Sequence, residues 1–217
     1  MSEQIIIHLF IILGVILVSM TLHEAMHGFV AYWLGDDTAK AQGRLTLNPV
    51  KHIDPFLTIM LPLLLALVGA PIFGGAKPVP YNPGRLRYDE WGSALVAFAG
   101  PLTNFVLAFV IFGIGALLGY NIAGQVYPDI VGLILYYGVL VNLGFFVFNM
   151  IPIPPLDGSR VLYALAPDFV RRWMEIIEQY GLIFVFAIVL LASSVIGSLM
   201  GTVIMAILDF FTKLFIV

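Results

Sequence analysis

Long uncharged stretches dominate the pattern of hydrophobic and polar positions along the chain. Each reaches or exceeds the roughly 18 residues that mark a candidate membrane span. They run from Ile5 to Leu22, Pro55 to Ala76, Leu95 to Gly119, Ile130 to Leu156 and Gln179 to Leu208. This pattern predicts an all-α polytopic membrane protein with about four to five transmembrane helices, folded as a single domain over residues 1–217.

The composition supports the same class of protein. Of the 217 residues, 61% are hydrophobic and 11% are charged, whereas a soluble domain is about half apolar and about a quarter charged. A water-soluble globule is therefore excluded, and the lipid bilayer is the expected surrounding. The net charge of −3 is too small to indicate a nucleic-acid partner. The absence of cysteine excludes disulfides, thiolate nucleophiles and cysteine-ligated metals.

The basic side chains are concentrated in three of the connections between the apolar stretches. Nine of the ten lie there, namely Lys40, Arg44, Lys51, Lys77, Arg85, Arg87, Arg160, Arg171 and Arg172. The first 39 residues and the connection 121–129 contain no lysine or arginine. Because cytoplasmic loops are enriched in these residues, we expect the amino terminus and residues 121–129 outside and the three basic loops in the cytoplasm.

The second uncharged stretch departs from a simple series of crossings. The basic loops on both of its sides are expected on one face of the membrane, so the stretch between them should not cross. Its core from Phe56 to Val68 has 13 residues, about 20 Å as a helix against a hydrocarbon thickness of about 30 Å. We therefore expect a re-entrant segment over residues 56–75.

The remaining chain predicts helices at 5–34, 91–119 and 129–151, a short helix at 158–166, and one long helix or two in the last 40 residues. Two loop strings, GRLTL and AKPVPY, combine β-forming residues with glycine and proline. They predict short β-strands at the membrane surface over residues 44–47 and 77–81. Such strands could pair with an unwound substrate by strand addition.

The string HEAMH, in the first predicted helix, is the strongest chemical signal. On a helix, His23 and His27 are separated by about one turn, so both imidazoles can reach one metal ion with Glu24 beside it. Ionisable groups inside a membrane helix are costly, and a divalent cation supplies the shared partner that this group needs. The helix rises about 27 Å from Ile5 to His23, so the site is expected near the cytoplasmic face.

Two histidines leave a zinc ion one protein ligand short of the three that catalytic sites usually have. The helix at 129–151 is expected to run inward, so the string NMIPIPPLDG brings Asp157 to the depth of the histidines. Taken alone, Asp157 after two prolines would be a turn residue or a helix N-cap. The incomplete metal site makes it the predicted third ligand.

Four further polar residues are candidates for roles at the site. Asn104 could contact substrate or stabilise an oxyanion, or it could make an interhelical hydrogen bond. Asn142 and Asn149 lie seven residues apart on one helical face, where packing is the favoured role and an active-site role is second. His52 could gate the metal or serve as an extra ligand, although a loop histidine bonded to backbone is the simpler interpretation.

These strings resemble the site-2 protease family of intramembrane zinc metalloproteases. The resemblance rests on HEAMH, AGPLTN, FNMIPIPPLDGSRVL, GRLTLNPVKHIDP and GGAKPVPYNP, and it covers most of the chain. It is strongest to the compact branch without PDZ or CBS domains. The resemblance implies that His23, His27 and Asp157 bind Zn²⁺, that Glu24 is the catalytic base, and that the substrates are transmembrane-helix proteins cleaved within the bilayer.

The sequence therefore predicts an intramembrane zinc endopeptidase that hydrolyses a peptide bond in or near a transmembrane helix, to release a regulator or to clear membrane remnants. Two alternatives stay open. One is a membrane-anchored zinc peptidase that acts on soluble peptides at the cytoplasmic surface, and the other is a non-catalytic metal-binding membrane protein. The protein is expected in the plasma membrane of a prokaryote, with its active site toward the cytoplasm.

Overall fold

The computed structural model describes residues 3–61, 64, 75–124 and 129–215, most of which are helical. Four helices are long and apolar enough to cross a membrane, namely α1 (Glu3–Trp33), α4 (Asp89–Leu117), α5 (Ile130–Asn149) and α8 (Ser193–Phe215). The other helices are α2 (Thr38–Ala41), η1 (Pro49–His52), η2 (Pro55–Met60), η3 (Pro83–Arg85), α6 (Asp157–Leu165) and α7 (Asp168–Leu191). The prediction of an all-α, multi-pass membrane protein is confirmed.

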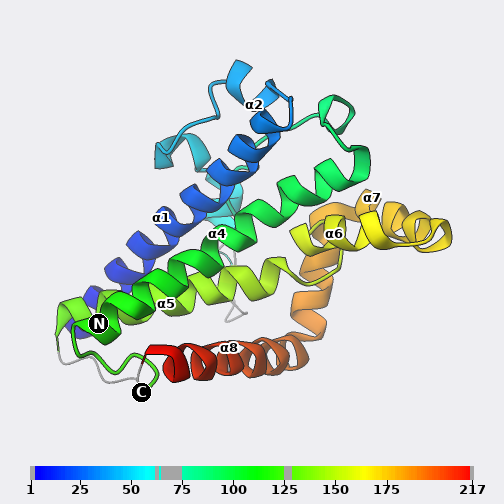
Figure 1. Ribbon diagram of the computed structural model, residues 1–217. Helices are drawn as coiled ribbons and strands as arrows, with labels where there is room; N and C mark the ends of the chain where they lie inside the picture. The colour runs from blue at the N-terminus through cyan, green and yellow to red at the C-terminus, as the bar shows by residue number, and fades with distance from the viewer. Residues whose placement is uncertain (1–2, 62–63, 65–74, 125–128, 216–217) are drawn as a thin grey trace.

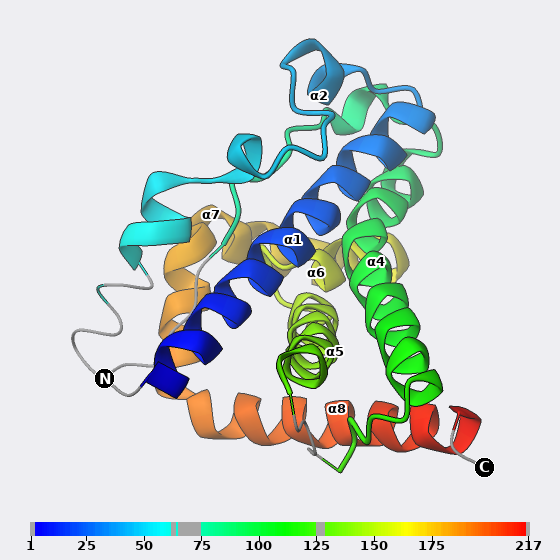
Figure 2. The same cartoon turned by 90° about the vertical axis from the view of Figure 1, so that its left-hand side faces the viewer.

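Helix α4 is the central element of the bundle. It packs against α1, α5 and α6, and Figure 1 shows α1, α4 and α5 running side by side. Figure 2 looks along α5, with α1 and α4 on either side of it and α8 crossing below. Helix α1, which carries the HEAMH string, contacts both α4 and α5, and α6, which begins at Asp157, contacts α4.

Close packing of small against large side chains holds the helices together. A buried cluster joins α4, α5 and α8, and consists of Ala108, Phe112, Val139, Leu143, Leu208 and Phe211 with Ile122 from the loop between α4 and α5. Gly113 faces Phe215, and Gly138 faces Ile111. In lipid the hydrophobic effect does not drive helices together, so such close contacts and interhelical hydrogen bonds carry the association.

The helix boundaries agree closely with the pattern of apolar positions. The helices predicted at 5–34, 91–119, 129–151 and 158–166 correspond to α1, α4, α5 and α6. The carboxy-terminal region forms two helices that are separated at Ala192, and α7 is bent at Gly181, whose φ of 51° and ψ of −131° are not helical. Figure 1 shows this sharp bend in α7.

The predicted β-strands at 44–47 and 77–81 are wrong. Both segments are described, and neither forms a strand. Pro78 and Pro80 have no N–H to donate to a ladder, and the Arg44 guanidinium, rather than a neighbouring strand, donates to the carbonyl oxygens of Lys77 and Pro78 at 2.8 and 3.4 Å. Without these strands, the hypothesis that an unwound substrate pairs with them by strand addition is not supported.

The predicted re-entrant segment over 56–75 is not supported. Its beginning forms the helix η2, and residues 62–63 and 65–74 lie outside the described part of the chain. At the other end, the Gly75 N–H donates to the Leu57 carbonyl at 3.1 Å, and the Thr58 hydroxyl donates to the Gly75 carbonyl at 2.7 Å. Gly75 thus lies beside η2.

Candidate functional site

Helix α1 places the HEAMH residues on one side, as the spacing predicts. The ligand atoms of His23, Glu24 and His27 all lie within 4.8 Å of one another. Both histidines are buried, and their rings meet edge to face with centroids 4.7 Å apart. One turn of apolar helix therefore brings three potential metal-binding or catalytic groups together.

Asp157 completes this group from a distant part of the chain. It is the first residue of α6, and its Oδ2 lies 3.2 Å from His23 Nε2 and 3.5 Å from His27 Nε2. Ligands at about 2.0–2.1 Å from a tetrahedral zinc ion are about 3.3 Å apart. The structure thus brings the three predicted ligands together at the spacing of a zinc site, although their role as ligands stays a prediction.

The charge of Asp157 is set by its neighbours. Burial by itself would raise its pKa, but the His27 and His23 imidazoles beside the carboxylate hold its pKa below the usual value. An ionised carboxylate is the form that binds a metal ion. The environment therefore keeps Asp157 ready to act as a ligand at neutral pH.

Each imidazole is oriented by a hydrogen bond from its other nitrogen. His23 Nδ1–H donates to Asn104 Oδ1 at 2.6 Å, and His27 Nδ1–H donates to the Val96 carbonyl at 2.7 Å. These bonds direct both Nε2 atoms at Asp157, and each Nε2 can bind a metal ion once it has lost its proton. Two imidazole nitrogens and one carboxylate oxygen fit Zn²⁺, which when bound would polarise a scissile carbonyl and acidify a water molecule.

Asn104 and Asn142 form a fully buried interhelical network rather than a substrate surface. Asn104 Nδ2 donates to Asn142 Oδ1 at 2.8 Å, and Asn142 Nδ2 donates to Ser19 Oγ at 2.9 Å. The network links α1, α4 and α5, and through Asn104 it fixes the His23 ring. Asn149 differs, because it lines a cavity that His23, Glu24, His27 and Asp157 also line, and it donates to the Phe145 carbonyl at 3.0 Å.

Two glycines allow the backbones to approach closely enough for this geometry. A Cβ on Gly100 would lie 2.5 Å from His27 Nε2 and 2.6 Å from His23 Nε2, and a Cβ on Gly158 would lie 2.4 Å from the Met150 carbonyl oxygen. Sequence reasoning gave neither glycine a role, although both belong to the strings AGPLTN and PLDG. The local sequence contains no signal for these close approaches, which depend on His23, His27 and Met150 opposite the glycines.

An extended segment, residues 76–82, lies over the catalytic glutamate candidate. Glu24 Oε2 accepts a hydrogen bond from the Val79 N–H at 2.9 Å. Buried Asp36 accepts from the Asn82 N–H at 2.6 Å, and Arg44 binds the other end of the segment. Burial would raise the pKa of Asp36, but the hydrogen bonds from Thr38 and Asn82 lower it below its usual value. Sequence reasoning missed these roles of Arg44 and Asp36.

His52 does not line the cavity next to His23, Glu24 and His27. It is fully buried, its Nε2–H donates to the Thr46 carbonyl at 2.8 Å, and its own carbonyl accepts from the Lys77 N–H at 2.9 Å. It supports the start of the extended segment from outside the cavity. The structure therefore favours the backbone-bonded loop histidine over the gate or extra ligand.

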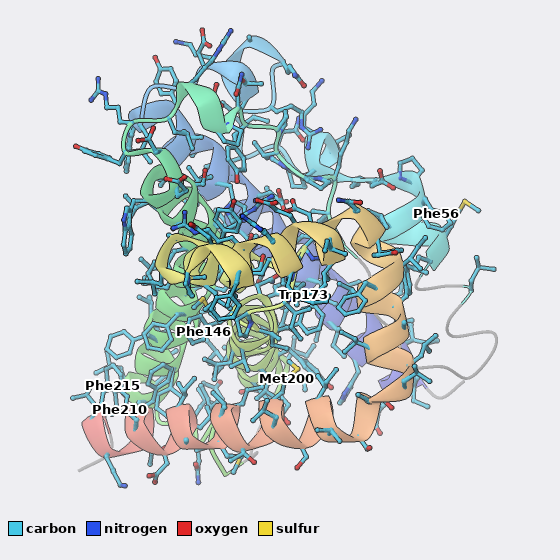
Figure 3. The ribbon with its side chains drawn as sticks, turned by 90° about the vertical axis from the view of Figure 1, so that its right-hand side faces the viewer. Phe56, Phe146, Trp173, Met200, Phe210 and Phe215 are labelled. Atoms are coloured by element: carbon cyan, nitrogen blue, oxygen red, sulfur yellow. The ribbon has the colours of Figure 1, made fainter. Side chains whose placement is uncertain are left out.

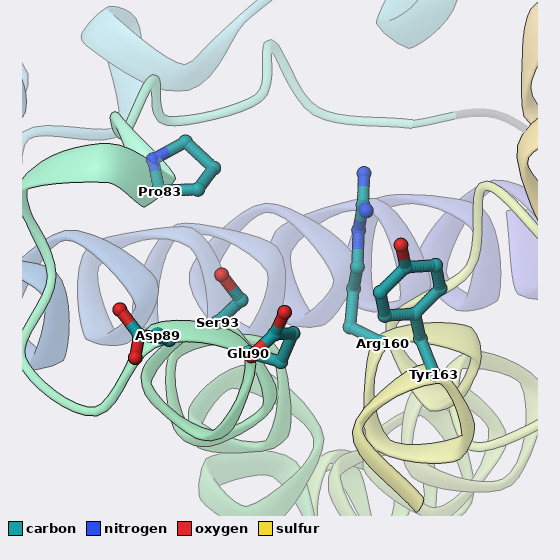
Figure 4. A pocket seen from close by; sticks show the side chains of 6 residues that line it. All are labelled: Pro83, Asp89, Glu90, Ser93, Arg160 and Tyr163. Carbon is teal, nitrogen blue, oxygen red and sulfur yellow. The ribbon is translucent and has the colours of Figure 1, made fainter. Parts of the chain in front are cut away.

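The candidate site opens into a cavity of about 510 Å³. Its walls are mostly apolar and come from α1, η2 with Leu61 just after it, the extended segment, α4, α5, α6 and α7. They include Met20, Val79, Phe145, Phe148 and Phe186. Arg160 and Glu178 form an ion pair on the lining of the cavity. A second cavity of about 310 Å³ lies between α4 and α6 and shares Arg160 (Figure 4).

Replacing Gly100 with alanine is expected to reduce zinc binding, because the new methyl group would occupy the space next to both Nε2 atoms. We expect zinc affinity to fall by about 10–100-fold, measured as metal per purified chain against a chelator. Gly14→Ala, on the same helix as the histidines but with nothing within 4 Å of its Cβ, is the matched control. Wild-type affinity in Gly100→Ala would contradict the described geometry.

Replacing Asn104 with leucine removes the acceptor that orients His23. Zinc affinity is again expected to fall by about 10–100-fold, since the imidazole loses the partner that fixes its tautomer. Thr103→Val serves as control, because that hydroxyl bonds only within α4, to the Ala99 carbonyl at 2.8 Å. An unchanged affinity in Asn104→Leu, measured by chelator competition, would show that the ring is held by other contacts.

Comparisons with known proteins identify the family. The model of peptidase family M50 matches residues 10–130 and 121–193. The chain is 42% identical over 170 residues to "Putative zinc metalloprotease YwhC" of Bacillus subtilis, a match that covers 77% of this chain and 74% of the relative. It is 33% identical over 181 residues to "Putative zinc metalloprotease Rip2" of Mycolicibacterium smegmatis, covering 81% of this chain and 64% of that protein. No solved structure matches the chain.

The family match agrees with the chemistry of the site and with the apolar helices around it. His23, Glu24 and His27 form a group that could hold the zinc ion of a zinc metalloprotease. Four helices long and apolar enough to cross a membrane agree with a membrane protein. The chain belongs to peptidase family M50, the site-2 protease family, and is a multi-pass membrane zinc metalloprotease.

Proposed function

We propose that this metalloprotease is an intramembrane endopeptidase that hydrolyses a peptide bond in or near a transmembrane helix of a membrane protein. The observation that carries the proposal is the location of the site. His23, Glu24 and His27 lie within α1, a helix apolar enough to span a membrane, and they open into a largely apolar cavity. An apolar segment of substrate fits such walls better than a water-soluble peptide does.

The residues of the chain divide the reaction between them. His23, His27 and Asp157 would hold the metal ion. Glu24 accepts a proton from the attacking water while the water oxygen bonds to the scissile carbonyl carbon. Glu24 then returns that proton to the departing nitrogen as the C–N bond breaks. The hydrogen bond from Val79 directs the carboxylate of Glu24 and connects it to the extended segment. Unwound substrate backbone needs polar partners in a dry site, and Asn149 offers one on the lining of the cavity.

The active site is proposed to face the cytoplasm of a prokaryotic cell. His23 is about 30 Å along α1 from its first residue. Basic residues are concentrated on the loops at this end, with Lys77 in the extended segment and Arg44 bound to it. Because positive loops are retained on the cytoplasmic side, the charges and the depth of the site agree.

Glu24→Gln tests the proposal, with a single-pass substrate in vesicles and its soluble peptide as two substrates. We expect the wild type to cleave the embedded substrate and Glu24→Gln to lose about 10²–10⁴-fold in rate while it retains zinc. Glu175→Gln, whose carboxylate accepts from the Tyr163 hydroxyl outside the catalytic cavity, is the control and should cleave normally.

Each other result would point to a different function. Preferential cleavage of the soluble peptide would support a peptidase of the cytoplasmic surface. Undiminished cellular function in Glu24→Gln would support a non-catalytic metal-binding protein. Loss of zinc together with activity would show that Glu24 is needed to build the site, and would remove the assignment of Glu24 as a proton carrier.

A further inference from the structure

The first half of α7, residues 168–180, presents an apolar stripe that the described protein does not cover. Phe169, Trp173, Ile176 and Tyr180 are exposed by 68%, 66%, 44% and 62%. Their spacing of three or four residues places them on one side of the helix. Trp173 extends from α7 on the side turned toward α8 (Figure 3). A second side of the helix, marked by buried Met174, packs against the protein. A third side, marked by Arg172, is exposed and polar.

The charges and the bend show that this half of α7 does not cross a membrane by itself. Residues 168–180 include Asp168, Arg171, Arg172, Glu175 and Glu178, and α7 is not among the helices apolar enough to span. The helix is interrupted at Gly181 and ends at Leu191. Its second half is therefore only about 15 Å long, half the thickness of the hydrocarbon core.

The same helix half is attached to the active site. Met174 is buried, and Arg171 donates to the carbonyl oxygens of Tyr163 and Ala164 at the end of α6. Glu178 pairs with Arg160, which lies one helical turn after Asp157. Gly181 and Phe186, at and beyond the bend, line the catalytic cavity. The orientation of α7 is thus coupled to the walls of the cavity.

We propose that residues 168–180 form an in-plane helix at the membrane surface, with the stripe Phe169, Trp173, Ile176 and Tyr180 inserted into the lipid. Phenylalanine, tryptophan and tyrosine are the side chains enriched at membrane interfaces. The stripe continues along the chain into exposed Ile183, Leu190 and Leu191 and then into the exposed apolar side chains of α8, a membrane-spanning candidate. One continuous lipid-facing surface accounts for all of them.

The apolar stripe, rather than charge, drives this contact. Residues 168–180 contain three acidic and two basic side chains, and so have a net charge of −1. A helix that bound anionic headgroups electrostatically would carry an excess of lysine and arginine. The contact is therefore expected to be as strong on neutral phosphatidylcholine as on a mixture with phosphatidylglycerol.

The absence of native cysteine permits a direct test with single-cysteine variants of the whole chain. A spin label is attached at one position in each variant: Trp173→Cys on the stripe, Arg172→Cys on the polar face or Met205→Cys on α8. Each labelled protein is studied in phosphatidylcholine vesicles, with and without phosphatidylglycerol. We expect Trp173→Cys and Met205→Cys to be accessible to oxygen and shielded from a water-soluble nickel chelate, and Arg172→Cys to show the reverse, in both lipid mixtures.

Three results would overturn the proposal. Equal exposure of positions 172 and 173 to the nickel chelate would place the helix in water. Shielding of both positions from the nickel chelate would show that the helix is buried in protein or in the hydrocarbon core. A disulfide-linked dimer of Trp173→Cys in dilute vesicles would show that a second copy of the chain covers the stripe.

A second test moves the spin label to residue 176, so that Trp173 itself can be replaced. With a label at Ile176→Cys, replacing both Phe169 and Trp173 by serine is expected to raise the water-exposed fraction by at least about tenfold, since burial of one aromatic side chain changes an equilibrium by more than that. Replacing Arg172 and Glu175 by serine is the matched control and should leave the label shielded. These readouts do not depend on proteolysis, so they separate this proposal from the proposed function.

Discussion

The convergence of the Asp157 carboxylate on two imidazoles is the contact on which the rest of the structure depends. Ionisable groups inside an apolar bundle are costly unless they have partners, and here each group has its partner on another segment. His23 and His27 come from the first long helix, whereas Asp157 begins α6 more than a hundred residues later. Helix α4 lies between these segments, and its Gly100 is small enough to let the Nε2 atoms and the carboxylate meet.

Hydrogen bonds that do not touch substrate give the site its shape. Asn104, Asn142 and Ser19 fix α1, α4 and α5 against one another, and Asn104 transmits this arrangement to the His23 ring. On the other side of the cavity, Arg44 and Asp36 fix the two ends of the extended segment whose Val79 N–H reaches Glu24. The candidate site residues are therefore held from both sides by polar contacts to backbone and to amides. Membrane proteins satisfy such groups internally because lipid offers no alternative partners.

Several roles could not be recognised from local sequence, for identifiable physical reasons. The string AKPVPY has the composition of a β-edge, but its prolines lack N–H groups, and side chains of Arg44 and Glu24 satisfy the backbone instead of a second strand. His52 and Asn142 carry functional groups typical of active sites, yet both are buried away from the cavity by neighbours distant in the sequence. Gly100 and Gly158 matter because of what lies opposite them, and a glycine itself gives no indication of its neighbour.

The sequence by itself determined the long helices and their suitability for a membrane, because apolar length and helical spacing are local properties. It also determined HEAMH as one metal-binding face of a helix, since positions four apart share a side whatever surrounds them. The expected depth of Asp157 also predicted which carboxylate meets the histidines. Only the tertiary structure decided which asparagine orients them and where α7 bends. Those features depend on how closely three backbones approach, and that distance is set by the glycines and side chains of all three helices together.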